Sequence, residues 1–179
     1  MPPLRDACCS NHCCSNHRYT NRMSDTDENA SRIEDPLALE QQVCFALAVA
    51  SRTVISVYRP VLEPLGLTHP QYLVMLALWG SEPLSVTDLA RMLELDPGTL
   101  SRLLKRLEAA GLVQRDRDTQ DERSLAVVLT TRGRDLRQQA LAVPGTILTR
   151  LGMEVDELLT LHARLTEVIA AAKSASPTD

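Results

Sequence analysis

A single cysteine lies within an apolar helical stretch, and its thiol is the side chain there best suited to covalent chemistry. Cys44 is one position off the apolar stripe of a helix expected over Leu39–Arg59. Pro60 limits this helix, because proline pushes the residue before it out of helical conformation. A cysteine thiolate is the species that peroxides oxidise to sulfenic acid. The alternative is a small buried hydrophobic residue that only packs, and the residue alone leaves both interpretations open.

Four further cysteines lie in a repeat near the N-terminus. The segment Cys8–His17 reads CCSNHCCSNH and also contains two histidines. A zinc site needs ligand pairs separated by a chain reversal, and this spacing provides none, so we expect no metal and no cofactor. We expect residues 1–35 to form a disordered tail, with Met23 as an alternative start of translation.

Two short helices joined by a tight turn are expected within residues 85–110. In the first, Ser85–Leu93, apolar residues recur at i, i+3, i+4 and i+7, and Ser85 is suited to cap the N-terminus. Asp96 caps the second helix, which has Pro97 at its first position and ends at Gly111. The pattern predicts a helix-turn-helix whose second helix enters a DNA major groove. The inward stripe of that second helix consists of Leu100, Leu103, Leu104 and Leu107.

Hydroxyl and cationic side chains occupy the outward face of the second helix. Hydroxyls near its N-terminus can reach base edges, and the cations can reach phosphates or guanine. The alternative is a solvated charged face on an ordinary helix, and the hairpin that follows weighs against it. The candidate DNA-binding residues of this face are Thr99, Ser101, Arg102, Lys105 and Arg106.

A charged hairpin, the wing, follows the helix-turn-helix. Leu112–Arg115 and Leu125–Leu129 have strand composition, and the segment between them contains no apolar residue. We expect Arg117 and Arg123 to enter the narrow minor groove, where the potential is most negative. Asp121 is placed to orient the guanidinium of Arg123.

The composition is that of a mainly helical protein without a global basic excess. Of 179 residues, 44% are hydrophobic and 3% aromatic, so Leu, Val and Ala build the core. The formal net charge is −4, whereas Pro97–Ala110 carries three basic residues and one acidic residue, a balance that suits a site-specific DNA-binding protein. No run of 18 apolar residues exists, and the N-terminus lacks the apolar segment of a secretory signal. We therefore expect a cytoplasmic protein with no membrane partner.

Helices on both sides of the DNA-reading unit are expected to form a dimer. Gln71–Trp79 is apolar on most sides, which predicts a buried central helix. The region Arg132–Lys173 reads as helical except at Val143-Pro144-Gly145. So small a unit cannot cover the apolar faces of the flanking helices, which favours a twofold homodimer. The expected organisation is one domain over 36–173, with the helix-turn-helix at about 85–110, the wing at about 112–130, and a disordered tail at 174–179.

From Leu39 to about Ala172 the chain resembles the MarR family of dimeric winged-helix regulators, and within it the organic hydroperoxide-sensing repressors (OhrR). The resemblance implies a mainly α fold, with a winged helix-turn-helix domain, N- and C-terminal dimerisation helices and a two-stranded β-wing. It implies a transcriptional regulator rather than an enzyme, bound to a pseudo-palindromic double-stranded DNA operator. In that subfamily the cysteine matching Cys44 is oxidised by organic hydroperoxides, and the repressor then leaves DNA. The matching segments are Leu39–Leu47, Ser51-Arg52, Tyr58-Arg59-Pro60, Pro70–Leu73, Leu78-Trp79, Asp96–Leu100, Asp121–Ser124 and Pro144-Gly145-Thr146.

Tyr58 and His69 are the candidate partners of the Cys44 thiol. The family commonly has a tyrosine one turn after the cysteine and another before the Pro-Gln-Tyr run, where this chain has Ala48 and His69. Cys44 and Tyr58 stand 14 residues apart on one helix, about 21 Å, so their contact requires Tyr58 from a partner subunit. No cysteine follows Cys44, so the resemblance implies a one-cysteine sensor that a low-molecular-weight thiol or overoxidation completes.

Two other functions stay open. The first is a MarR-type repressor released by a small phenolic ligand, in which Cys44 has only a structural role. A Cys44→Ser substitution separates this function from peroxide sensing. The second is a thiol peroxidase, which the absence of a Cys-x-x-Cys motif and of a βαβ pattern disfavours.

Overall fold

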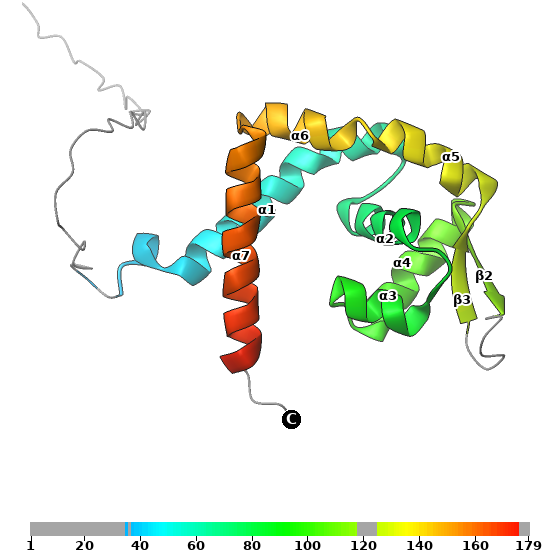
Figure 1. Cartoon of the computed structure of the whole chain (residues 1–179), viewed down its shortest axis with the longest axis horizontal. Coiled ribbons are helices and arrows are strands. Elements are labelled where there is room, and N and C mark those ends of the chain that lie inside the picture. The colour runs from blue at the N-terminus through cyan, green and yellow to red at the C-terminus, as the bar shows by residue number, and fades with distance from the viewer. Residues whose placement is uncertain (1–34, 36, 118–124, 176–179) are drawn as a thin grey trace, which may run out of the picture. The chain divides into compact units, whose positions relative to one another are not determined.

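The computed structural model describes residues 35, 37–117 and 125–175 (Figure 1). The predictions for the N-terminal tail, for Asp121 and Arg123 at the wing tip, and for residues 176–179 lie outside the described residues. Contacts divide the chain between Ala38 and Leu39, and every element belongs to the second unit. The elements are the 3-10 turns η1 (Leu39–Gln41) and η2 (Glu63–Leu65), the helices α1 (Val43–Leu62), α2 (His69–Gly80), α3 (Val86–Leu93), α4 (Pro97–Ala109), α5 (Thr131–Ala140), α6 (Val143–Leu151) and α7 (Val155–Ala175), and the strands β1 (Leu84–Ser85), β2 (Val113–Arg117) and β3 (Leu125–Leu129).

The core lies where α2, α3 and α4 pack against the sheet, and aliphatic side chains fill it. The prediction of an inward leucine stripe on the second helix is confirmed, since all four leucines are buried. The expected burial of α2 is only partly met, because Leu73 and Leu76 are exposed while Tyr72 is buried. The largest fully buried side chains are Leu62, Val74, Met75, Leu78, Leu89, Leu100, Leu104, Leu107 and Val127.

The expected helix caps are present. Ser85 Oγ accepts a hydrogen bond from the Asp88 N–H at 3.0 Å, and Asp96 Oδ1 accepts one from the Thr99 N–H at 2.8 Å. Each bond satisfies one of the backbone donors that a helix N-terminus leaves unpaired. After α4, Gly111 takes the left-handed conformation at φ 67°, which a glycine adopts without steric cost.

The sheet has three strands, whereas the sequence indicated two. β3 lies between β1 and β2, and both pairings are antiparallel. Leu84 and Ser85 form β1 opposite Val127 and Ala126. A two-residue strand carries no recognisable alternation, so its pairing is visible only in three dimensions.

The boundaries of α1 and of α6 differ from the prediction. α1 begins at Val43 instead of Leu39 and continues through Pro60 to Leu62. Proline removes the hydrogen bond to the carbonyl of Ser56, but Ser56 is exposed, so water can solvate that carbonyl, and burial of Leu62 favours the final turn. The break expected at Val143-Pro144-Gly145 lies two residues earlier, at Leu141 and Ala142, because Val143-Pro144-Gly145 form the first turn of α6. Proline is favoured there, since its missing N–H would have no partner in any case.

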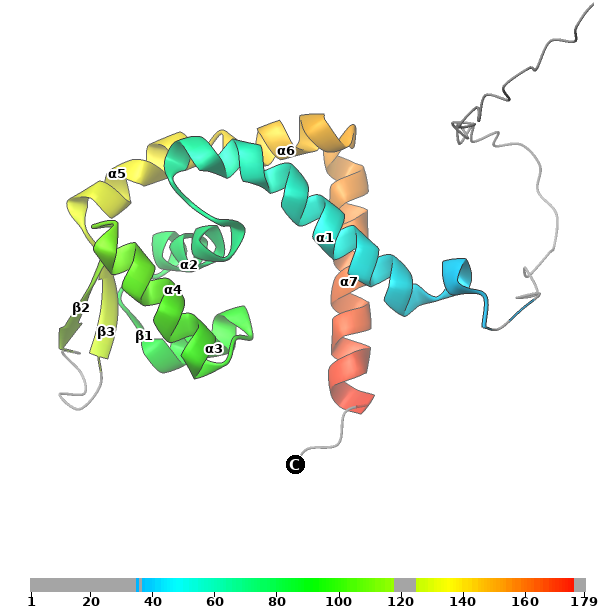
Figure 2. The same cartoon turned by 180° about the vertical axis from the view of Figure 1, so that it is seen from behind.

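The first two-thirds of α1 and the whole of α7 expose large apolar side chains. α6 packs against α1, and α5 and α6 follow one another above α2 in both views (Figure 2). By length and composition, Val43–Leu65 is long and apolar enough to cross a membrane, although it contains no run of 18 consecutive apolar residues. A helix covered by another protein chain meets the same criterion. The exposed apolar residues include Val43, Phe45, Leu47, Val49 and Ile55 on α1, and Val155, Leu158, Leu159, Leu161, Leu165, Val168 and Ile169 on α7.

Candidate nucleic-acid interface and thiol site

The polar face of α4 presents three cations to solvent. Arg102, Lys105 and Arg106 are exposed, and none of them forms an ion pair with another described residue. Ser101 and Thr99 are half-buried near the helix N-terminus. The face therefore combines hydroxyls at one end with unpaired positive charge along its length, an arrangement that suits base edges and phosphates.

The N-terminus of α4 is fixed by Asp96. Hydrogen bonds from Thr99 hold the pKa of the Asp96 carboxyl below its ordinary value. The capping carboxylate is therefore ionised at neutral pH, and its charge is favourable at the positive end of the helix dipole. Thr99 thus contributes to the helix start as well as lying on the face that Arg102 shares.

The wing strands β2 and β3 pair in register up to Arg117 and Leu125. The backbone of Arg117 therefore lies at the end of the described hairpin, next to the tip.

An ion pair that the sequence did not predict joins the wing to α4. Arg115 Nε on β2 lies 3.1 Å from Glu108 Oε1 on α4. Both side chains are largely shielded from solvent, so this pair links the wing to the helix with the cationic face. The alternation of the strand places Arg115 on one face, but nothing local to the sequence identifies Glu108 as its partner.

Cys44 is exposed in the first turn of α1. Tyr58 lies on the same continuous helix, 14 residues further on, so the two side chains are separated by about 21 Å of helix. The structure of a single chain therefore does not bring the thiol and its predicted partners together.

Tyr58 and His69 do lie together, at the junction of α1 and α2. Their ring centroids are 5.1 Å apart in an edge-to-face arrangement, and Tyr72 follows at 6.2 Å from Tyr58. Burial lowers the pKa of His69 from its ordinary value of 6.5. His69 is therefore neutral at pH 7, so it can act as a hydrogen-bond donor but does not supply a positive charge.

A cavity of about 500 Å³ opens beside His69. Apolar walls with a few charged groups at the rim are typical of small-molecule sites. The position is therefore relevant to the ligand-released alternative. Its lining residues are Ile55, Arg59, Glu63, Gly66, Leu67, Thr68, His69 and Pro70.

Comparisons with known proteins agree with this geometry. Residues 67–125 match the model of the MarR family. Over 131 residues the chain is 42% identical to the organic hydroperoxide resistance transcriptional regulator of Bacillus subtilis, covering 73% of this chain and 89% of the relative. This chain belongs to the MarR family.

Solved MarR-type structures show the same fold. AbfR of Staphylococcus epidermidis superposes with a TM-score of 0.64 at 31% identity, covering 76% of this chain and 94% of AbfR. Reduced AbfR bound to DNA superposes at 0.60 with 34% identity, covering 75% and 94%, and overoxidised AbfR bound to DNA gives the same values. The chain is therefore a MarR-family transcriptional regulator with a mainly helical winged-helix fold, and the relatives and the fold are those of regulators rather than enzymes.

Proposed function

We propose that this MarR-family regulator is a homodimeric repressor of organic peroxide-resistance genes, and that oxidation of Cys44 releases it from its operator. The observation that carries the proposal is the position of Cys44, an exposed thiol in the first turn of an apolar helix arm. The 42% identity to an organic hydroperoxide resistance regulator supports the same function. A protein that binds chromosomal DNA in this way acts in the cytoplasm.

The apolar arms are the dimer interface of this proposal. α1 and α7 leave 12 large apolar side chains at least 36% exposed, far more than a helix in water retains without a partner. Twofold pairing buries the same surface on both copies. Antiparallel packing of the two α1 helices then brings Cys44 of one subunit to Tyr58 and His69 of the partner subunit, which one chain cannot do.

The DNA contacts divide between α4 and the wing. Ser101 and Arg102, with Thr99 before them, read bases in the major groove, while Lys105 and Arg106 neutralise phosphates. Arg117 and Arg123 enter the minor groove, with Asp121 orienting Arg123. In a dimer, the two α4 helices must lie about 34–36 Å apart to meet successive major grooves of a pseudo-palindromic operator.

The redox step starts from the Cys44 thiolate. Its sulfur attacks one oxygen of an organic hydroperoxide, the O–O bond breaks, and the alkoxide leaves as an alcohol after taking up a proton. The product is a sulfenic acid. A low-molecular-weight thiol then condenses with it to give a mixed disulfide and water, because no cysteine follows Cys44 in the sequence. The added group cannot fit the packed contact with Tyr58 and His69 of the partner subunit, so the arms move and the spacing of the α4 helices changes.

The size of the group on Cys44 is central to release. A relative has been solved on DNA in both reduced and overoxidised forms. Overoxidation is therefore compatible with DNA binding in that relative. We infer that a bulky mixed disulfide on Cys44 releases this protein more completely than the addition of oxygen alone.

A DNA-binding titration tests the proposal. Wild-type protein on operator DNA is exposed to an organic hydroperoxide with and without a small thiol, and Cys44→Ser is the matched variant because it keeps the four N-terminal cysteines. We expect release of wild type, strongest with the thiol present, and retention of Cys44→Ser. Equal release of both proteins would overturn the sensor function of Cys44.

A repressor released by a small phenolic ligand is the second candidate. The cavity beside His69 favours it, because its apolar wall and the rim charges of Arg59 and Glu63 match a phenolic compound. In this case a phenolic ligand releases wild type and Cys44→Ser alike, and the hydroperoxide releases neither.

A further inference from the structure

The Glu82 side chain forms a hydrogen bond that extends the pairing of β1 with β3 by one step beyond the strand residues. β1 and β3 pair Leu84 with Val127, so the same antiparallel register places residue 82 opposite Leu129. Glu82 precedes the strand and Pro83, and its Oε2 accepts the Leu129 N–H at 2.9 Å. A side-chain carboxylate thus takes the place of a backbone carbonyl at the base of the wing.

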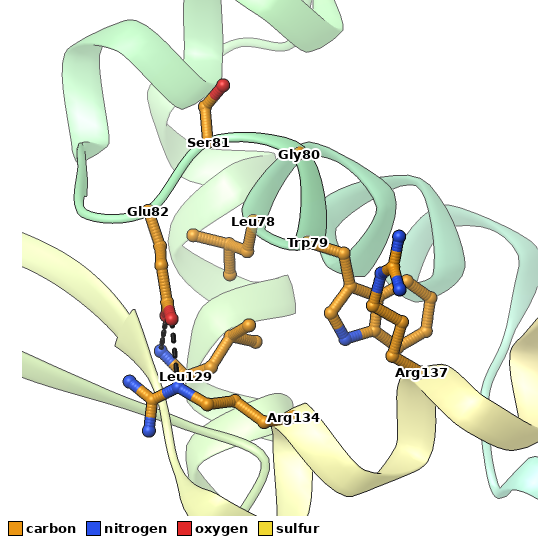
Figure 3. A pocket seen from close by; sticks show the side chains of 8 residues that line it. All are labelled: Leu78, Trp79, Gly80, Ser81, Glu82, Leu129, Arg134 and Arg137. Carbon is orange, nitrogen blue, oxygen red and sulfur yellow. Dashed lines mark hydrogen bonds and ion pairs between the residues drawn. The ribbon is translucent and has the colours of Figure 1, made fainter.

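The second oxygen of the same carboxylate reaches the next helix. Glu82 Oε1 accepts a hydrogen bond from Arg134 Nε on α5 at 2.8 Å (Figure 3). The Glu82 side chain is 27% exposed and the Arg134 side chain is 54% exposed, so solvent screens the Arg134 side of this charged pair more than the Glu82 side. We call the contact among Glu82, Leu129 and Arg134 the carboxylate bridge, since it ties the loop after α2 to the end of β3 and to the first turn of α5.

Two neighbouring contacts hold the start of α5 in place. The Trp79 indole Nε1 donates to the Gly133 carbonyl at 2.9 Å. Gly133 approaches the wing so closely that a Cβ there would lie 2.0 Å from the Leu112 carbonyl oxygen. The first turn of α5 is therefore packed against both the end of α2 and the residue before β2.

We propose that Glu82 is a positioning residue that couples α5 to the orientation of the wing. Through α5 it also couples the helices α6 and α7, which follow α5 in the chain, to the wing. A displacement of α6 and α7 can reach β3 through α5, because α5 follows β3 directly in the chain and the carboxylate bridge ties its first turn to Leu129. The inference rests on the proposed function in one respect, namely that the wing contacts DNA. Glu82 itself makes no DNA contact in this account and acts only through β3.

The chemistry of the bridge requires both carboxylate oxygens. Glutamine at this position has one acceptor oxygen and an amide NH2, which cannot accept from the Leu129 N–H or from Arg134 Nε. Glu82→Gln therefore loses one of the two bonds while keeping the size of the side chain. Asp135→Asn is the matched control, because it removes one negative charge from an exposed position on α5.

A double-mutant cycle tests whether Glu82 acts through the wing. We expect Glu82→Gln to weaken operator binding by about 5- to 10-fold in wild-type protein and in the Arg102→Ala background. In the Arg123→Ala background, where the wing-tip contact is already lost, the same change should cost less than about 2-fold. Asp135→Asn should leave affinity within about 2-fold in every background. Equal losses from Glu82→Gln in the Arg102→Ala and Arg123→Ala backgrounds would overturn the proposal.

A second readout keeps the test independent of DNA. Amide hydrogen exchange at Leu129 should be faster in Glu82→Gln than in wild type and unchanged in Asp135→Asn, while exchange at the core residue Leu104 stays the same. Arg134→Gln, which removes only the α5 half of the bridge, provides a milder variant if Glu82→Gln unfolds. Unchanged exchange at Leu129 in Glu82→Gln would refute the bridge. Failure of wild type to bind any operator would instead refute the proposed function and leave the exchange result standing.

Discussion

Replacement of Gly133 by alanine should disrupt the packing of α5 against the segment that leads into the wing. The distances in the structure allow the loss of stability to be estimated. A Cβ at this position would lie 2.0 Å from the Leu112 carbonyl oxygen, 3.1 Å from its carbon and 3.3 Å from Leu129 Cδ2. A normal contact needs a separation of at least 3.0 Å, so the α5 backbone must move by about 1 Å. The neighbour is a backbone carbonyl that accepts a hydrogen bond from the Thr130 N–H, so it cannot rotate away as a flexible side chain would.

The expected cost follows from that displacement. Overpacking of this kind destabilises by about 1–3 kcal/mol, and loss of the Trp79–Gly133 hydrogen bond adds about 1 kcal/mol. For a chain of this length, about 2–4 kcal/mol lowers the Tm by roughly 5–15 °C. Operator affinity should fall as well, because the displaced segment leads directly from β3.

Urea denaturation and operator titration measure both effects. Gly145→Ala on α6 is the control, since a Cβ there meets nothing within 4 Å. It should leave stability unchanged or raise it by up to about 1 kcal/mol, because alanine has less freedom than glycine in the unfolded chain. A Gly133→Ala protein as stable as wild type would show that α5 does not pack against Leu112 as described.

Three further predictions concern DNA binding and pH. Arg123→Ala should weaken operator binding by about 1–3 kcal/mol and reduce the salt dependence, and unchanged affinity in a folded dimer would exclude a wing contact. Arg102→Ala should relax base preference, whereas Lys105→Ala should weaken all operator variants alike, and a uniform loss for Arg102→Ala in a panel of operators would argue against base reading. Burial lowers the pKa of His69, so the unfolded chain binds its proton first as the pH falls, and stability should decrease below about pH 6.5. In urea melts between pH 7.5 and 5.5, His69→Gln should show a weaker pH dependence than wild type, and an identical dependence would contradict the assignment.

The helix-turn-helix could be predicted from the sequence because its signals are local. Ser85 and Asp96 form their caps within three residues, and the four leucines of α4 lie on one face whatever surrounds the helix. The strands of the wing were predicted for a similar reason, apart from a shift of β2 by one or two residues. Local chemistry dominates in these segments, so the structure agrees with the pattern.

The remaining features depend on contacts between distant residues. Passage of α1 through Pro60 depends on burial of Leu62 against the core, and the Glu108–Arg115 ion pair depends on the packing of β2 against α4. The carboxylate bridge joins residues 47 and 52 positions apart in the sequence. No periodicity in the sequence marks Glu82. Its side chain accepts the Leu129 N–H only because β1 begins at Leu84, opposite Val127, and so offers no strand residue opposite Leu129.

The surroundings of the thiol also depend on contacts between distant residues, which the sequence pattern does not reveal. The sequence indicated that Cys44 and Tyr58 lie too far apart on one helix to touch, and the continuous α1 agrees with that distance. The association of Tyr58 with His69 and Tyr72 was not foreseen as a cluster, since it needs the packing of α1 against α2. In the proposed function, Cys44 of one subunit meets Tyr58 and His69 of the partner subunit, an arrangement that a single chain does not contain.

A time course of peroxide treatment tests the central claim most directly. Operator-bound wild-type protein is treated with an organic hydroperoxide and a small thiol, and mass spectrometry of the Cys44 peptide is read alongside the fraction of protein still on DNA. We expect release from DNA and formation of the Cys44 mixed disulfide to proceed at the same rate, while Cys44→Ser stays bound throughout. Release that precedes modification of Cys44, or release of Cys44→Ser at the wild-type rate, would contradict it.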